Sequence, residues 1–225
     1  IIGDESGTIT VATNTGATGS HVTDLNYVRL NGTDYMPEMY HGRFSVSSST
    51  ELANIVSKTI TFEKTQMPDL SYLGKTVLIA GVDSSWSPTH ANGAINYATA
   101  SGSSAAQIRA NANEGRGYIN YTAHGSETSW YDPSFTVSDV NAMTNSGKYG
   151  LMVGNCCVTN KFNHTSPCFG EAIIRKADGG GVAYIGGTNN TYWDEDYYWA
   201  VGYKTNPNGS APAYDATKLG AYDAM

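Results

Sequence analysis

Two stretches decide the fold: Gly117-Tyr-Ile-Asn-Tyr-Thr-Ala123 and Tyr149-Gly-Leu-Met-Val-Gly154. Each is a short apolar run typical of a β-strand, and each ends on a reactive side chain. The first leads into His124-Gly125 and the second into Asn155-Cys156-Cys157. In an open α/β sheet, ligands and chemistry collect at the carboxyl ends of the strands. We therefore expect this histidine and this pair of cysteines to meet at one rim of a sheet.

Strand and helix signals alternate along most of the remaining chain. This alternation predicts an α/β fold with a doubly wound, mostly parallel sheet flanked by helices. The expected strands, besides the two above, span 76–81 and 181–186. The first expected helix begins with a capping box at 48–51, the second spans 93–113, and the third runs from Thr136 to Gly147. The fourth begins at Ser166-Pro167 and has Phe169, Ala172, Ile173 and Ala177 on one face. A fifth begins within 194–199. Residues 5–20 are predicted as a surface loop, and 25–44 as a hairpin with an irregular excursion.

The chain length and its ends bear on domain organisation. A chain of 225 residues can hold one α/β domain with a full core, or two small ones. No internal repeat or second boundary is visible, so we expect residues 1–225 to form a single domain. The chain opens on Ile1-Ile2-Gly3-Asp4, which resembles the end of a buried strand, and stops at Met225 inside a helical pattern. We expect a fragment of a larger precursor, truncated at both ends.

Composition excludes several classes of function. The net charge is −7, and no stripe of Lys and Arg is present to neutralise phosphates, so nucleic acid is not an expected partner. An acidic protein is compatible with basic substrates, although most acidic proteins are merely soluble. No apolar run approaches the length of a transmembrane helix. The 3 cysteines include no metal-type Cys-x-x-Cys pair, which argues against zinc.

Cys157 is the candidate nucleophile. A thiolate attacks, so its pKa must be lowered by a nearby base or a helix N-terminus. A buried structural thiol is the commoner fate of a cysteine and stays open as the alternative. Cys156 is the better candidate for an inert core residue, because neighbours on a strand point to opposite faces. Cys168, at the first turn of a predicted helix, could be activated there but has no histidine at a strand end.

His124 is the candidate general base and acid, the alternative being a surface histidine in a Gly-Ser loop. Gly125 lacks a Cβ, so its N–H can approach a ligand closely. Together with the N–H of Cys157 it could form an oxyanion hole. Asp83 follows the strand over 76–81 and could orient the imidazole, although an ordinary loop or N-cap aspartate is an equally good interpretation.

An acidic cluster lies among aromatic residues near the C-terminal end. Asp194, Glu195 and Asp196 stand beside Tyr192, Trp193 and Trp199. A carboxylate with aromatic walls suits an ammonium group, through charge pairing and cation–π contact. A calcium site, or acids at the positive end of a helix, is the alternative.

Four motifs carry a resemblance to a known family: Asn-Tyr-Thr-Ala-His-Gly-Ser-Glu-Thr at 120–128, Gly-Asn-Cys-Cys at 154–157, Pro-Cys-Phe-Gly-Glu at 167–171 and Tyr-Trp-Asp-Glu-Asp-Tyr-Tyr-Trp at 192–199. They closely resemble the gingipain cysteine peptidases, and among these the lysine-specific members. Shorter matches extend the resemblance over nearly the whole chain from about residue 21. Caspases and legumains share a more distant pattern, in which one apolar run precedes His-Gly and another precedes Cys.

The resemblance implies a role for each motif residue. Cys157 is the nucleophile, His124 its partner and Asp83 the third catalytic residue. Asp196 receives the ammonium group of a substrate lysine. The walls of that pocket are Thr122, Asn155, Tyr192 and Trp193. The stretch between Asp83 and His124 is shorter than in the known enzymes.

The resemblance also implies a caspase-like α/β/α sandwich serving as a single catalytic domain. Family members are secreted or held at the bacterial cell surface, are made as zymogens, are activated by reducing agents and are stabilised by calcium. The resemblance further implies that the N-terminal part of the catalytic domain and a C-terminal immunoglobulin-like domain of the precursor lie outside this sequence.

We therefore expect a secreted cysteine endopeptidase that cleaves proteins and peptides after lysine. We expect no cofactor for the chemistry, while the resemblance allows for structural calcium. An arginine-cleaving relative is the nearest alternative. A catalytically silent homologue acting as an adhesin or binding module is the alternative from another class.

Overall fold

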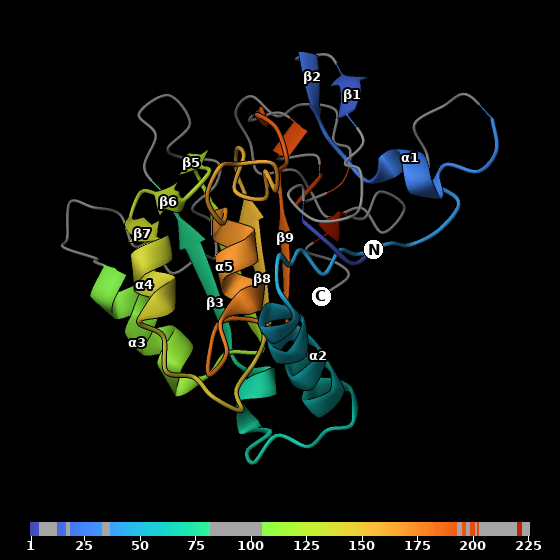
Figure 1. Ribbon diagram of the computed structural model, residues 1–225. Helices are drawn as coiled ribbons and strands as arrows, with labels where there is room; N and C mark the ends of the chain where they lie inside the picture. Colours follow the sequence, from blue (N-terminus) through green and yellow to red (C-terminus); the bar gives the residue numbers. More distant parts are fainter. Residues whose placement is uncertain are drawn as a thin grey trace.

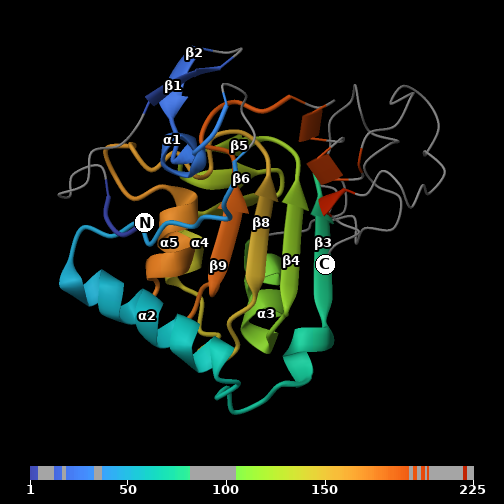
Figure 2. The ribbon, with the colours of Figure 1, turned by 90° about the vertical axis from the view of Figure 1, so that its right-hand side faces the viewer.

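The computed structural model describes residues 1–4, 13–16, 19–32, 37–81, 105–192, 195–196, 199–200, 202 and 220–221. At its centre lies a parallel sheet in which the described strands follow the order β3-β4-β8-β9. These strands are β3 (Thr76–Ala80), β4 (Tyr118–Thr122), β8 (Leu151–Asn155) and β9 (Ala183–Gly186). Figure 2 shows the four arrows side by side, with their carboxyl ends at one rim.

The register of the sheet brings the strand ends level with one another. Thr122, the last residue of β4, pairs with Ala80 on one side and with Asn155 on the other. Gly154 pairs in turn with Gly186 of β9. Residues that follow these strands therefore emerge at the same rim, as the sequence predicts.

Three helices pack on one face of the sheet: α3 (Ala105–Glu114), α4 (Val137–Asn141) and α5 (Phe169–Arg175) (Figure 1). The core between these helices and the sheet takes every second residue of each strand, because successive side chains of a strand point to opposite faces. The buried members of this core include Val77, Ile79, Ile119, Tyr121, Met152, Ile108, Val140, Phe169 and Ile173. This arrangement confirms the predicted α/β architecture.

Helix α2 (Ser49–Glu63) lies beyond β9 and packs against α5 (Figure 2). Its Lys58 is buried, and the Nζ atom donates to the carbonyl groups of Ile173, Gly179 and Gly181 at 3.0–3.3 Å. Those carbonyl groups lie at or just beyond the end of α5. The lysine therefore fixes the C-terminal end of α5.

The N-terminal end of α5 holds two loops of the sheet rim. The N–H of Phe169 donates to the carbonyl oxygen of Glu127 at 2.7 Å, and that of Gly170 to Thr159 at 2.9 Å. One loop follows β4 and the other follows β8. Arg175, in the last turn, ties α5 to the N-terminal segment through Asp4 at 2.9 Å.

An antiparallel meander follows β4, and the sequence does not predict it. Its strands are β5 (Gly125–Ser126), β6 (Ser129–Tyr131) and β7 (Ser134–Thr136). Trp130 of β6 is fully buried, and its ring stacks on that of Tyr121 with the centroids 4.8 Å apart. The meander thus packs on the core directly under the rim.

Near the N-terminus, the structure corrects two expectations. The predicted loop over 5–20 includes a strand pair, β1 (Thr13–Gly16) with β2 (Gly19–Val22). The predicted hairpin over 25–44 contains instead a short helix, α1 (Leu25–Val28). Further along the chain, a short 3-10 helix, η1 (Ser71–Gly74), precedes β3.

Two predicted helices also have different boundaries, and a third lacks part of its predicted capping box. The helix from Thr136 ends at Asn141, since the buried Asn145 side chain bonds Gly180 and Lys148 and closes a turn. The helix from Ser166-Pro167 begins at Phe169 and ends before Ala177. The side chain of Ser48 does cap α2, but the Glu51 carboxylate accepts from Ser47 rather than completing the box.

Candidate active site

The loops that carry His124 and Cys157 are in direct contact. Each residue lies just beyond the end of its strand, and the two strands are neighbours. Gly125 explains how closely the loops approach. A Cβ built on Gly125 would lie 2.7 Å from the sulfur of Cys156 and 2.7 Å from the carbonyl oxygen of Cys157. Only glycine fits this contact without moving one of the loops.

Hydrogen bonds from the core hold the backbone of His124, and the residue itself is exposed. The carbonyl oxygen of His124 accepts from the Tyr121 hydroxyl at 2.7 Å and from the Tyr131 N–H at 3.0 Å. The same hydroxyl oxygen accepts from the N–H groups of Tyr131 and Asp132. Burial raises the pKa of Tyr121, so the phenol keeps its proton and donates it to His124.

The sulfur of Cys157 lies against Thr191, a residue that the sequence analysis missed. The thiol donates to the Thr191 carbonyl oxygen at 3.5 Å, and the Thr191 N–H donates to the sulfur at 3.4 Å. Cys157 is half-buried, so a reagent can reach it. No periodicity or motif marks Thr191, because its importance comes only from this contact between loops.

The other two cysteines belong to the core. Cys156 is 1% exposed and its sulfur contacts the Thr159 hydroxyl at 3.6 Å. Burial raises the pKa of Cys156 and of Cys168, which disfavours both thiolates. The prediction that Cys156 is a core residue is confirmed. The first turn of α5 does not activate Cys168, because burial outweighs any effect of the helix end.

A cavity of about 500 Å³ opens beside these residues, between β8, β9 and the segment that begins at Asn190. Asp196 lies in its wall and is 8% exposed. Its carboxylate accepts from the Thr191 hydroxyl at 2.8 Å, and its carbonyl oxygen accepts from the Asn155 side chain at 3.1 Å. These bonds fix the acid at the end of β8.

The electrostatics of Asp196 favour a cationic ligand. Burial raises its pKa to about 6, the Thr191 hydrogen bond opposes that shift, and the charge of Glu195 adds to it. Among the described residues, no ion pair joins Asp196 to a cationic side chain. A buried carboxylate is costly without a positive partner, so an ammonium group entering the cavity would relieve that cost.

The structure brings most of the predicted pocket residues together. Asn155 lines the cavity, and so does Tyr192, which is 53% exposed at its mouth. Thr122 lies next to Asn155 on the adjoining strand and does not itself line the cavity. Asp83 and Trp193 lie outside the described residues.

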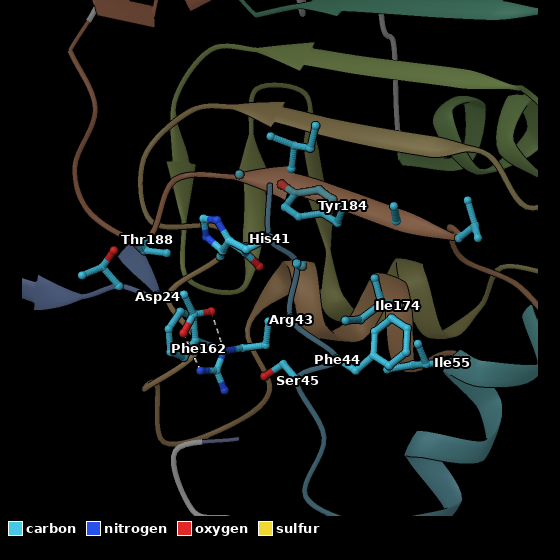
Figure 3. Close-up of a pocket in the computed structure, with 18 residues that line it drawn as sticks. Asp24, His41, Arg43, Phe44, Ser45, Ile55, Phe162, Ile174, Tyr184 and Thr188 are labelled. Atoms are coloured by element: carbon cyan, nitrogen blue, oxygen red, sulfur yellow. Dashed lines mark hydrogen bonds and ion pairs between the residues drawn. The ribbon is translucent and has the colours of Figure 1, made fainter. Parts of the chain in front are cut away.

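A second cavity, of about 390 Å³, lies between β9, α5 and the segment around Arg43 (Figure 3). Two of its charged side chains, Asp24 and Arg43, are paired with each other. Arg43 donates twice to the buried Asp24 carboxylate, at 2.8 and 2.5 Å, and its guanidinium lies 4.5 Å from the centre of the Phe162 ring. This pairing gives the cavity wall a structural role in joining the N-terminal segment to the sheet.

The described residues show neither a metal-binding cluster nor a membrane-spanning helix. In the part of the chain that the structure describes, no three His, Cys, Asp or Glu side chains are grouped so as to hold a metal ion. No helix among the described residues is long and apolar enough to cross a membrane.

Comparisons with known proteins identify the family of this chain. The model of peptidase family C25 matches residues 1–220. Lys-gingipain of Porphyromonas gingivalis (strain ATCC 33277) is 46% identical over 218 residues, which cover 90% of this chain and 12% of that protein. A solved structure described as a protease has a TM-score of 0.84 at 41% identity, covering 99% of this chain and 52% of that one.

A solved structure of the Arg-specific cysteine proteinase gingipain R has a TM-score of 0.73 at 26% identity, and the match covers 85% of this chain and 48% of that one. The resemblance found in the motifs is therefore confirmed. This chain spans only a small part of the curated relative and about half of each solved chain. With a family model matched over nearly its whole length, the chain belongs to peptidase family C25.

Proposed function

We propose that this domain is a cysteine endopeptidase that hydrolyses peptide bonds after lysine. The observation that carries the proposal is the cavity whose buried Asp196 carboxylate is joined through Thr191 to the sulfur of Cys157. A substrate side chain ending in an ammonium group would meet the carboxylate while its carbonyl carbon lies near the thiol.

The proposed reaction proceeds in two steps. The Cys157 thiolate attacks the scissile carbonyl carbon, the N–H groups of Gly125 and Cys157 donate to the oxyanion, and His124 protonates the leaving amine. His124 then removes a proton from water, which attacks the acyl-enzyme and releases the thiolate. The close contact between Gly125 and Cys157 supports this pairing of oxyanion donors. Asp83, outside the described residues, is proposed to orient the imidazole.

Lysine is proposed over arginine on two grounds. The acid is fixed at one point by Thr191 and Asn155, which suits the single charge of an ammonium group. The chain is also more similar to Lys-gingipain, at 46% identity, than to the solved Arg-specific proteinase, at 26%. Thr122, Asn155, Tyr192 and Trp193 are proposed to complete the pocket.

The setting of the enzyme is proposed by analogy with its relatives. We propose that it acts outside the cell or at the bacterial surface, as part of a larger precursor, on proteins that contain lysine. Structural calcium is proposed from the motif resemblance alone, and no described cluster identifies its ligands. Thermal unfolding with calcium and then with a chelator tests this point, since a bound ion should raise the midpoint.

The test of the function uses the full-length protein with reductant. Three peptides should differ only in having Lys, Arg or Asn before the scissile bond. We expect turnover of the lysine peptide alone, its loss in Cys157→Ala, and its survival in Cys156→Ala as the matched control. Arginine turnover would keep the nucleophile and overturn the specificity. No turnover by folded protein would overturn the proposed activity and favour a silent binding module.

A further inference from the structure

Thr191 contacts both the thiol and the acid of the candidate site. Its N–H and carbonyl oxygen lie 3.4 and 3.5 Å from the sulfur of Cys157. Its hydroxyl oxygen lies 2.8 Å from the Asp196 carboxylate and 3.8 Å from the same sulfur. One hydroxyl group thus stands within reach of the candidate nucleophile and of the acid that would bind the substrate.

The position of that hydroxyl group is fixed by the shape of threonine. A β-branched side chain has restricted χ1 freedom. The methyl group of Thr191 packs against Gly187, where a Cβ would lie 3.0 Å from it. The hydroxyl oxygen is therefore held in place while its hydrogen remains free to turn about the C–O bond.

A hydroxyl group carries a single hydrogen, so it can serve only one of its two neighbours at a time. With the cavity empty, the charged carboxylate at 2.8 Å takes the hydrogen, because bonds to ionised acceptors are the stronger ones. The charge of Asp196 already acts on the sulfur of the preceding residue, Cys156, because it helps raise the pKa of that thiol. The sulfur of Cys157, at 3.8 Å, lies within reach of the same hydroxyl group.

We propose that Thr191 is a positioning residue that couples occupancy of the Asp196 cavity to the reactivity of the Cys157 thiol. An alkylammonium group in the cavity pairs with the carboxylate, which compensates its charge and weakens its hold on the Thr191 hydroxyl hydrogen. The Thr191 hydroxyl hydrogen is then released to donate to the sulfur, and the thiolate is stabilised. Binding of the correct side chain thereby activates the nucleophile. This inference rests on the proposed function, in which Asp196 receives the substrate ammonium group.

The test measures alkylation of Cys157 by iodoacetamide, a neutral reagent that does not need the cavity. The rate is followed by mass spectrometry of the Cys157 peptide in the full-length protein, at fixed pH, with and without butylammonium as the probe. The other ionisable groups facing the site, His124, Glu195 and Cys156, are the same in every sample. We expect butylammonium to accelerate alkylation roughly fivefold. This is less than the roughly tenfold change in rate that a shift of one pKa unit would produce.

Two variants of Thr191 separate the hydroxyl group from the shape of the residue. Thr191→Ser keeps the hydroxyl group and should keep the acceleration. Thr191→Val keeps the branched shape and should show the same rate with and without the probe. Equal acceleration in Thr191→Val and the unmodified protein would overturn the inference, because the coupling would then bypass the hydroxyl group.

Calorimetry of butylammonium binding distinguishes the remaining outcomes. Binding without acceleration, or with slower alkylation, overturns the role of Thr191 and leaves the proposed pocket intact. Failure of butylammonium to bind the unmodified protein overturns the pocket assignment, and with it this inference.

Discussion

A methyl group added at residue 125 should push the two halves of the candidate active site apart. In Gly125→Ala the new carbon would lie 2.7 Å from the Cys157 carbonyl oxygen and 2.7 Å from the Cys156 sulfur. Carbon and oxygen atoms in weak contact normally lie about 3.3 Å or more apart, so the loops must separate by roughly 0.6 Å. Both neighbours are buried or part of the backbone, so neither can swing away.

The cost of that separation should appear mainly in catalysis. A misplacement of about 1 Å can cost roughly 100-fold in rate, so we expect kcat/KM for a lysine peptide to fall about 10- to 100-fold. Overpacking of this kind also destabilises by about 1–3 kcal/mol. The assay is peptide turnover together with thermal unfolding, to separate loss of activity from loss of folded protein.

Gly74→Ala is the matched control, because a Cβ at Gly74 meets nothing within 4 Å. It should keep the activity and the unfolding temperature of the unmodified protein. Activity of Gly125→Ala within twofold of the unmodified protein would refute the reasoning, since the two loops would then not be in contact at this glycine.

Three further predictions follow from the charges of the site and its support. Because the pKa of Asp196 is raised to about 6, the folded protein binds a proton that the unfolded chain releases. The contribution of Asp196 to the free energy of unfolding should therefore fall as pH rises from about 4 to about 6. Asp196→Asn should remove this contribution and should also abolish lysine cleavage. A pH dependence unchanged in the variant would contradict the assignment. Arg43→Met should cost about 3–5 kcal/mol in chemical denaturation, because it leaves the Asp24 carboxylate buried and unpaired, and adding Asp24→Asn should recover much of the loss. Iodoacetamide should modify Cys157 far faster than Cys156 in the folded protein, and comparable rates in a time course would refute the burial argument.

The sheet could be predicted from the sequence because its central strands are buried on both faces. Such strands are continuous apolar runs, and the runs ending at Ala123 and Gly154 carry that signal. Their parallel pairing then places His124 and Cys157 at one rim without any knowledge of side-chain contacts.

The meander after β4 could not be predicted in the same way. Its strands have only 2 or 3 residues each, too few to show alternation, and Gly125-Ser126 has no apolar side chain. The early end of the helix after Thr136 depends on bonds from Asn145 to Gly180, a residue remote in sequence. Thr191 was missed for a similar reason, since its partner Cys157 is also remote in sequence.

The central claim is that Cys157 reacts beside a pocket that selects lysine. A peptide chloromethyl ketone ending in lysine, compared with its arginine twin on the full-length protein, tests both parts in one experiment. Mapping by mass spectrometry should find a single adduct on Cys157, formed much faster with the lysine reagent and slowed in Asp196→Asn. An adduct on Cys156 or Cys168, or equal rates for the two reagents, would contradict the account.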